Sequence, residues 1–172
     1  GHGGNSMKEA GMQVLEHTDN LAIMGFVEVI KHLPRMMKIM GKTIDTISRT
    51  KPDRIILIDY PGFNLRLAKR IQHLKIPITY FILPQVWAWK EKRVETMKAV
   101  LDQTLSIFPF EQDWFDSRGL QTNYVGHPFA EQEHLDESSK DFYQRHDITI
   151  EHPLLVLLPG SRQQEVDRHW PI

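Results

Sequence analysis

The 172-residue sequence contains no cysteine, which excludes disulfide bonds, thiolate nucleophiles and cysteine-ligated metals. No apolar run approaches the ~20 residues that a membrane-spanning helix needs. The formal net charge is only −1, so no overall positive field favours nucleic acid as a partner. The nine histidines are scattered, and neither an HExxH motif nor an Asp-x-Asp cluster occurs, so no metal-ligand spacing stands out.

The composition that is present suits a folded globular protein, because 41% of the residues are hydrophobic and 25% are charged. The length suits one domain, or one domain and part of another. The sequence begins with a glycine-rich stretch that no strand precedes, and it stops just after a strand, a turn and the start of a helix. We therefore expect a piece of a longer chain.

Short apolar segments alternate with helical segments along the sequence. Strands are predicted at 54–59, 77–83, 103–108, 122–126 and 153–160. Helices are predicted at 63–74, 91–101, 111–119 and from 161 onward. This alternation predicts an α/β fold in which helices cover both faces of a parallel sheet. Such sheets bind ligands at the carboxyl ends of their strands, so the residues there are the functional candidates.

The first candidate is Asp59, which ends a predicted strand and precedes a tight turn at Gly62. A carboxylate in that place can act as a general base or orient a substrate hydroxyl. It can equally cap the helix that follows, and Asn64 is a second candidate for that cap. The residues alone leave both interpretations open.

The segment PQVWAWK, residues 84–90, follows the next strand and combines an amide, two indole rings and a run of charges. Gln85 offers hydrogen bonds, while Trp87 and Trp89 offer flat apolar faces on which sugar rings or acyl chains dock. Arg93 and the lysines beside it can meet a phosphate. Alternatively, both tryptophans pack beneath the next helix and the charges are solvated.

Two later strand ends carry candidates for binding an anion. His127, in GHP, can donate to a phosphate or act as a base, or it only makes a local hydrogen bond in its loop. In LLPGSR, the backbone N–H groups of Gly160 and Ser161 stand at a helix start, where anions bind. Arg162 can hold a phosphate through two parallel hydrogen bonds. The spacing matches neither GxGxxG nor the Walker pattern.

Together these motifs resemble those of the lipid-A-disaccharide synthase family. The matching stretches, which run from about residue 1 to residue 166, are MGFVEVIKHLPRMMK, KPDRIILIDYPGFNLRLAKR, PQVWAWKEKRV, FPFE, YVGHP and LLPGSRQQEV. The resemblance implies an inverting glycosyltransferase that needs no metal or other cofactor, with two Rossmann-like domains in the GT-B architecture. It implies UDP-2,3-diacylglucosamine as the donor, 2,3-diacylglucosamine 1-phosphate as the acceptor, and lipid A disaccharide 1-phosphate and UDP as products. It also implies a cytoplasmic location at the inner-membrane surface of a Gram-negative bacterium, with no nucleic-acid partner.

Carried over residue by residue, the resemblance implies that Asp59 deprotonates the acceptor 6-hydroxyl. Arg162 would stabilise the departing UDP, with Gly160 and Ser161 at the donor phosphates. The residues that would contact substrate are Asn64, Gln85, Trp87, Trp89, Arg93 and His127. Many relatives carry a second acid where this sequence has Gly62, so no role of that acid can be carried over.

The segment 24–40 is amphipathic, with basic residues interleaved among apolar ones at helical spacing. Its apolar residues are Val27, Ile30, Leu33, Met36, Met37 and Met40. By itself this pattern suits a helix that faces the core, and Pro34 either starts such a helix or kinks it. Taken together with the resemblance, the pattern suits a patch that lies on a membrane, because diacylated substrates must be taken from a bilayer.

We expect residues 1–150 to form the acceptor-side domain, without its first strand and loop, and residues 151–172 to begin a truncated donor domain. Such a piece is expected to show no turnover by itself. One alternative is another UDP-sugar transferase of the same architecture that uses a soluble acceptor. A second alternative is a non-catalytic module that binds a nucleotide or another anion.

Overall fold

The computed structural model describes all residues except 22–25, 131–138, 150–153, 162 and 171–172. The chain divides into two compact units, Gly1–Ala130 and Glu131–Ile172, and each is described by itself. The expected domain boundary between residues 150 and 151 stays a prediction.

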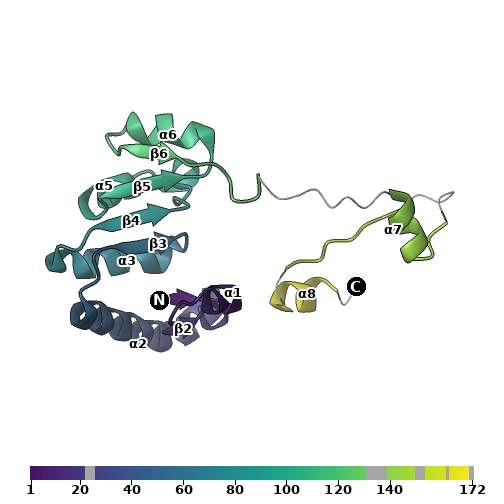
Figure 1. The fold of residues 1–172 in the computed structure, drawn as a ribbon, viewed down its shortest axis with the longest axis horizontal. Coiled ribbons are helices and arrows are strands. Elements are labelled where there is room, and N and C mark those ends of the chain that lie inside the picture. The colour runs from purple at the N-terminus through teal and green to yellow at the C-terminus, as the bar shows by residue number, and fades with distance from the viewer. Residues whose placement is uncertain (22–25, 131–138, 150–153, 162, 171–172) are drawn as a thin grey trace. The chain divides into compact units, whose positions relative to one another are not determined.

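The first unit carries most of the regular structure (Figure 1). It begins with β1 (His2–Gly3), α1 (Asn5–Glu9), β2 (Glu16–His17), the 3₁₀ helix η1 (Thr18–Asn20) and α2 (Phe26–Thr50). It continues with β3 (Ile55–Ile58), α3 (Pro61–Ile71), the 3₁₀ helix η2 (Gln72–Leu74), β4 (Ile78–Phe81), α4 (Val86–Trp89) and α5 (Arg93–Val100). It ends with β5 (Gln103–Ser106), α6 (Pro109–Asp116) and β6 (Thr122–Tyr124).

Four of the strands form one parallel sheet in the order β3-β4-β5-β6, and β1 pairs with β2 in a separate parallel ladder. The predicted fold class is confirmed as an α/β, Rossmann-like parallel sheet flanked by helices, but the expected cover of both faces by helices is not found among the described residues, since Ile56 and Ile58 on one face are exposed. Because sequence order and spatial order agree, right-handed crossovers carry α3, α5 and α6 to the same face of the sheet. The carboxyl ends of the four strands therefore meet at one edge.

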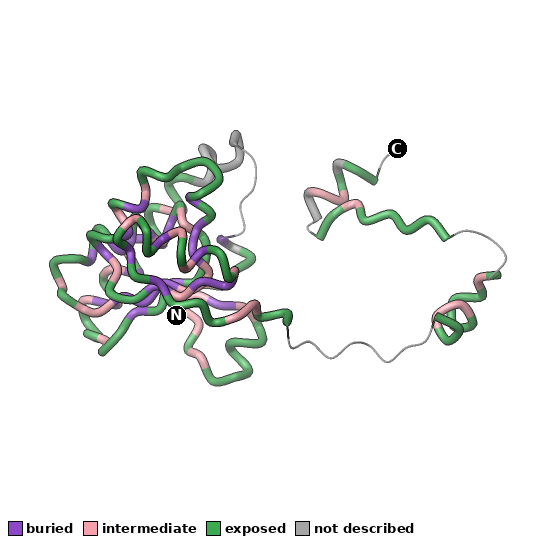
Figure 2. Tube along the Cα trace, turned by 90° about the horizontal axis from the view of Figure 1, so that it is seen from above, coloured by how far each residue is buried: buried purple, intermediate pink, exposed green. Residues whose placement is uncertain are grey.

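The two faces of β3 differ in burial. Leu57 points to the helix-covered face and is 4% exposed, whereas its neighbour Ile56 points to the other face and is 64% exposed. The run RIILID predicted a fully buried strand, and that expectation is wrong for Ile56 and Ile58. The reason is the sequential strand order, which leaves the second face without crossover helices among the described residues. Figure 2 shows the buried residues gathered in the strands and helices of the first unit.

Helix α2 runs through Pro34, so the proline lies inside one helix instead of starting a new one. The helix packs against α3, and its second half contributes Ile39, Met40 and Ile47 to the core. This half is therefore amphipathic because one side faces the protein interior. Although α2 has 25 residues, no helix within the described residues is both long and apolar enough to cross a membrane.

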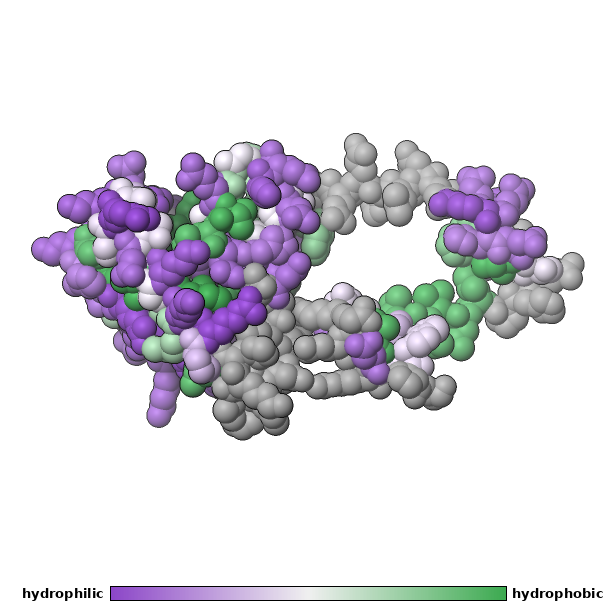
Figure 3. All heavy atoms as spheres, turned by 90° about the horizontal axis from the view of Figure 1, so that it is seen from below, coloured by the Kyte–Doolittle hydropathy of each residue, from purple (hydrophilic) through white to green (hydrophobic). Residues whose placement is uncertain are grey.

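The second unit contains α7 (Ser139–Arg145), which the sequence did not reveal, and α8 (Gln163–His169), which was predicted. The predicted strand at 153–160 is not formed: residues 154–160 pair with no strand in the described part of the chain. A strand needs a neighbour to satisfy its backbone N–H and C=O groups, so apolar sequence alone did not suffice. The side chains from Leu154 to Leu158 are exposed, and the second unit shows a hydrophobic surface, coloured green, in Figure 3.

The unequal faces of β3 generate a prediction. Leu57→Ala should lower the free energy of unfolding by about 2–5 kcal/mol, because it leaves a cavity in the core. Ile56→Ala, at the adjacent and exposed position, should cost less than about 1 kcal/mol. Urea denaturation of the two variants tests this, and equal losses would show that the face carrying Ile56 is covered.

Candidate functional site

The turn after β3 has left-handed backbone at two consecutive positions. Asp59 and Tyr60 are consecutive, and each has a φ of 44°. Aspartate tolerates this left-handed region, but it costs a bulky residue such as tyrosine about 1–2 kcal/mol. Strained backbone of this kind persists only where the surroundings hold it, and it gathers at functional sites. The side chain of Asp59 is exposed at the carboxyl end of the strand, as the sequence predicted.

Two side chains hold this turn through the carbonyl oxygen of Asp59. The Tyr80 hydroxyl on β4 donates to it at 2.5 Å, and the Asn64 amide donates to it at 2.7 Å. Asn64 also donates to the carbonyl of Ile58 at 3.1 Å. The interpretation of Asn64 as a helix cap is therefore wrong, since α3 begins at Pro61 and Asn64 lies within its first turn. Its amide nitrogen instead fixes the turn that carries Asp59.

Tyr80 is suited to this task because it keeps its proton. Burial is the main reason that the pKa of its hydroxyl is raised, and the negative charge of Asp59 adds to the effect. A hydrogen bond from Asn64 and the positive charge of Arg93 act in the opposite direction on this pKa, but they are weaker. The hydroxyl therefore remains a donor throughout the physiological pH range.

The two tryptophans have different environments. They lie on α4, a single helical turn that the sequence did not predict, and Gln85 precedes it with an exposed side chain. The Trp87 indole N–H donates to Glu111 Oε1 at 3.1 Å, and its ring meets Phe110 edge-on with centroids 5.2 Å apart. Trp89 is 70% exposed, against 36% for Trp87. One ring is thus anchored and the other is available to a ligand.

Positive charges border the exposed ring. The Lys90 ammonium lies 4.2 Å from the centre of the Trp89 ring, and the Arg93 guanidinium lies 6.0 Å from it. Cations at such distances are attracted to the face of an indole ring. Within the described residues neither cation forms a salt bridge. An exposed aromatic ring beside such cations suits a sugar that carries an anionic group.

Glu111 is a residue whose importance sequence reasoning missed. It occupies the third position of α6 after the N-cap Phe108, where a glutamate can reach back to the helix start. The residue is only 1% exposed, and Oε2 has no hydrogen-bond partner among the described residues. Burial raises the pKa of the Glu111 carboxyl. The hydrogen bonds from the Trp87 side chain and from the backbone N–H groups of Phe108 and Ile107 lower this pKa, but burial has the larger effect. The available signal was an acid three residues after the end of the strand predicted at 103–108, which corresponds to five residues after the end of β5.

His127 is built into its loop. Its ring centroid lies 5.7 Å from that of Phe108 and 5.4 Å from that of Phe129. Its Nδ1 accepts a hydrogen bond from the Phe129 N–H at 3.2 Å, and Gly126 before it has a positive φ of 88°. This is the local loop interaction named as the alternative, and any contact of His127 with substrate stays a prediction.

In the second unit, the N–H of Ser161 donates to Glu165 Oε2 at 3.0 Å. The Glu165 carboxylate thus binds the Ser161 N–H, which the sequence predicted as a donor to a phosphate. Gly160 has a φ of 144°, which favours glycine there. Arg162, the predicted partner of the donor phosphates, lies outside the described residues.

The predicted membrane patch on α2 is smaller than expected. Leu33 and Met37 are exposed, and Met36 is half-buried against the core. Met40 is 4% exposed and belongs to the core, so it is not available to a lipid surface. The predicted residues Val27 and Ile30 lie on α2, but their side chains are outside the described part of the structure.

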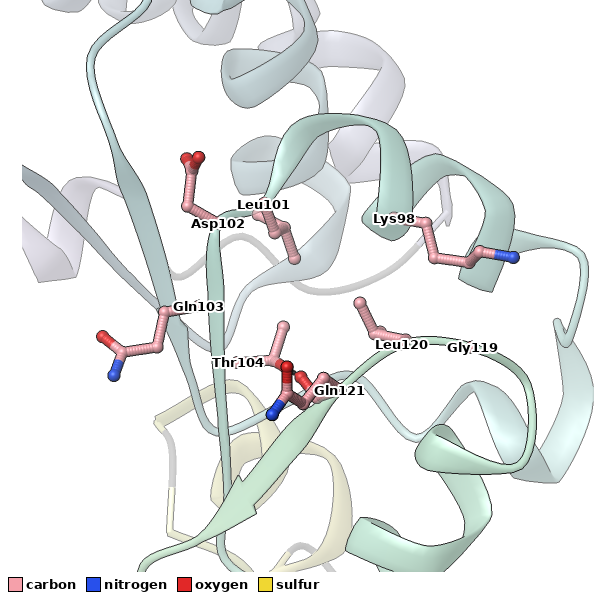
Figure 4. A pocket seen from close by; sticks show the side chains of 8 residues that line it. All are labelled: Lys98, Leu101, Asp102, Gln103, Thr104, Gly119, Leu120 and Gln121. Carbon is pink, nitrogen blue, oxygen red and sulfur yellow. Dashed lines mark hydrogen bonds between the residues drawn. The ribbon is translucent and has the colours of Figure 1, made fainter.

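Two cavities differ in their place on the sheet. One of ≈ 180 Å³ lies at the amino ends of the strands, where Figure 4 shows Lys98, Asp102 and Gly119 among the residues around it. Its polar groups serve the fold, because Asp102 Oδ2 accepts from the Ile78 N–H at 2.8 Å. The other, of ≈ 230 Å³, lies between α3 and α5 and includes Arg93. Only the second cavity adjoins the carboxyl-end site.

Comparisons with known proteins show the family to which this chain is similar. A family model described as "Lipid-A-disaccharide synthetase" matches residues 1–172. The chain is 37% identical to the "Lipid-A-disaccharide synthase" of Myxococcus xanthus (strain DK1622), over 99% of this chain and 45% of that protein. It is 38% identical to the protein of the same name from Gluconobacter oxydans (strain 621H), over 100% of this chain and 41% of that one. The chain thus spans less than half the length of these relatives.

The hydrogen bonds at the turn generate a prediction. Tyr80→Phe should lower the free energy of unfolding by about 1 kcal/mol, because the carbonyl of Asp59 loses one of its two side-chain donors. Urea denaturation measures this loss. Tyr124→Phe, at an exposed residue of β6, is the matched control and should change stability little. An equal effect of both variants would contradict the role given to Tyr80.

The environment of Glu111 generates a prediction about pH. Because its pKa is raised in the folded state, its contribution to stability is complete at low pH and is lost as the pH rises through that pKa. Glu111→Gln does not titrate, so its stability relative to the unchanged protein should increase from about pH 4 to pH 7. Chemical denaturation across this range measures the difference. Glu9→Gln, at an exposed glutamate that forms no salt bridge within the described residues, reports the general effect of removing one charge. A stability difference that falls with pH would contradict the prediction.

Proposed function

Because this chain belongs to the lipid-A-disaccharide synthetase family, we propose that it supplies the acceptor-binding part of a glycosyltransferase in lipid A biosynthesis. In this proposal UDP-2,3-diacylglucosamine is the donor and 2,3-diacylglucosamine 1-phosphate is the acceptor. The products are lipid A disaccharide 1-phosphate and UDP. The observation that carries the proposal is the held turn that presents an exposed Asp59 at the carboxyl end of β3.

The proposed chemistry is a single displacement with inversion. Asp59 takes the proton of the acceptor 6-hydroxyl while that oxygen bonds to the anomeric carbon of the donor. The bond from this carbon to the UDP oxygen breaks on the opposite side, and its electron pair leaves with UDP. A base fixed on a rigid turn supports such a step, since the reacting atoms must be aligned within a narrow range.

The remaining residues take supporting roles in this proposal. Trp89 and Gln85 contact the acceptor. The support is that both are exposed and follow β4, the strand that pairs with β3. Arg162 and Gly160 contact the donor diphosphate, a role that rests on the resemblance of the LLPGSR motif. Ser161 is a weaker candidate, because Glu165 already binds its N–H.

We also propose that the protein works in the cytoplasm on the inner-membrane surface. The exposed Leu33 and Met37 on α2 support this, because they stand beside the exposed basic residues Arg35 and Lys38. Apolar side chains flanked by cations suit the boundary between lipid headgroups and acyl chains. A diacylated acceptor would reach the site from that boundary.

The role of Asp59 can be tested in the full-length protein. Asp59→Asn should lower kcat by at least about 100-fold with folding retained, because general-base catalysis contributes about that much or more. Mass spectrometry of the disaccharide product measures the rate. Asp53→Asn, an exposed aspartate at the other end of the same strand, is the matched control and should keep its rate. Full turnover by the Asp59 variant would exclude this residue as the base.

A further inference from the structure

The cavity between α3 and α5 is lined by three cations. Arg66 and Lys69 come from α3 and Arg93 comes from α5, around a volume of ≈ 230 Å³. Among the described residues, none of these three forms a salt bridge with a carboxylate. Like charges around one small space repel one another, and an anion among them removes that repulsion. The cavity therefore has the electrostatic character of an anion site.

Its size indicates which anion fits. Pockets that enclose a whole small molecule usually measure about 300–1,000 Å³, so this one suits a single compact group. Guanidinium groups bind phosphate through parallel hydrogen bonds, and a lysine ammonium acts as a point charge. Pro61 and Gly62 of the same lining begin the eleven-residue α3, whose N-cap Tyr60 makes no side-chain capping bond. The start of that helix adds partial positive charge to the three cations.

The cavity also borders the turn that carries Asp59. Its lining begins at Pro61, two residues after Asp59. Burial does most to raise the pKa of the Tyr80 hydroxyl, but the charges of Asp59 and Arg93 both act on it, in opposite directions. Both charges therefore lie near the same hydroxyl group. A sugar whose phosphate lies in the cavity would extend toward Asp59.

We propose that Arg66, Lys69 and Arg93 bind a phosphate monoester, the 1-phosphate of the sugar acceptor, and so direct the acceptor toward Asp59. The identity of the sugar phosphate rests on the proposed function, whereas the anion site rests on the lining of the cavity. Arg66 and Lys69 are binding residues that the motifs of the sequence did not single out. Each contributes a charge that the phosphate neutralises.

Lys69 makes a sharp test of this proposal possible. Its side chain lines the cavity and is exposed on α3, so substitutions there do not disturb the core. Lys69→Glu replaces a positive charge of the lining with a negative one, and Lys69→Gln places a neutral side chain of nearly the same shape there.

The experiment titrates the isotope-labelled chain with N-acetylglucosamine 1-phosphate and follows amide shifts by NMR. Lys69→Glu should raise Kd about tenfold or more over Lys69→Gln, because it turns an attraction for the phosphate into a repulsion. Arg66→Gln should raise Kd by a similar factor. Arg70→Gln removes a cation of the same helix that is not part of the lining, so it should leave Kd unchanged. Equal affinities of the two Lys69 variants, or no effect of Arg66→Gln, would overturn the proposal.

Two further ligands identify the source of the phosphate. N-Acetylglucosamine, which lacks the phosphate, should produce no shifts at the cavity. Phosphatidylglycerol vesicles present a phosphate diester of the membrane, and binding to them without binding to the sugar phosphate would overturn the proposal. Because these titrations need no turnover, they are independent of the transferase assay with Asp59→Asn. Failure of the anion site and failure of the proposed chemistry are thus separate results.

Discussion

The backbone carbonyl of Asp59 accepts hydrogen bonds from the Tyr80 hydroxyl and the Asn64 amide, and the candidate site depends on this arrangement. Two consecutive left-handed residues would not persist in an isolated peptide, because the tyrosine at the second position opposes that conformation. The neighbouring strand and the first turn of α3 supply the two donors. The sheet therefore fixes a loop whose exposed carboxylate has a defined position.

The same edge of the sheet gathers the other functional groups, because the parallel strands end there. Trp87 is tied to the buried Glu111, so α4 is anchored and its neighbour Trp89 faces outward. Arg93, the first residue of α5, lines the cavity between α3 and α5 together with Arg66 and Lys69 of α3. An exposed carboxylate, an exposed aromatic ring and a cavity lined by cations are thus the features on which the proposed transfer to a phosphorylated sugar rests.

Sequence patterns predicted the strands and helices of the first unit well, because short apolar runs and helical periodicity are local signals. They also placed Asp59 and the tryptophans at strand ends. Long-range contacts could not be predicted from local patterns. No pattern indicated that the Asn64 side chain donates to a carbonyl of the turn instead of capping a helix. Burial of Met40 likewise depends on packing against α3. The strand expected at 153–160 failed for a related reason, since pairing depends on a neighbour that local sequence does not reveal.

The central claim is that the site supports transfer of a diacylated sugar to a sugar phosphate, with Asp59 as the base. The most direct measurement is mass spectrometry of the products formed by the full-length protein from UDP-2,3-diacylglucosamine and 2,3-diacylglucosamine 1-phosphate. The account predicts one lipid A disaccharide 1-phosphate for each UDP released. Release of UDP with free diacylglucosamine, or equal turnover of a deacylated acceptor, would contradict it.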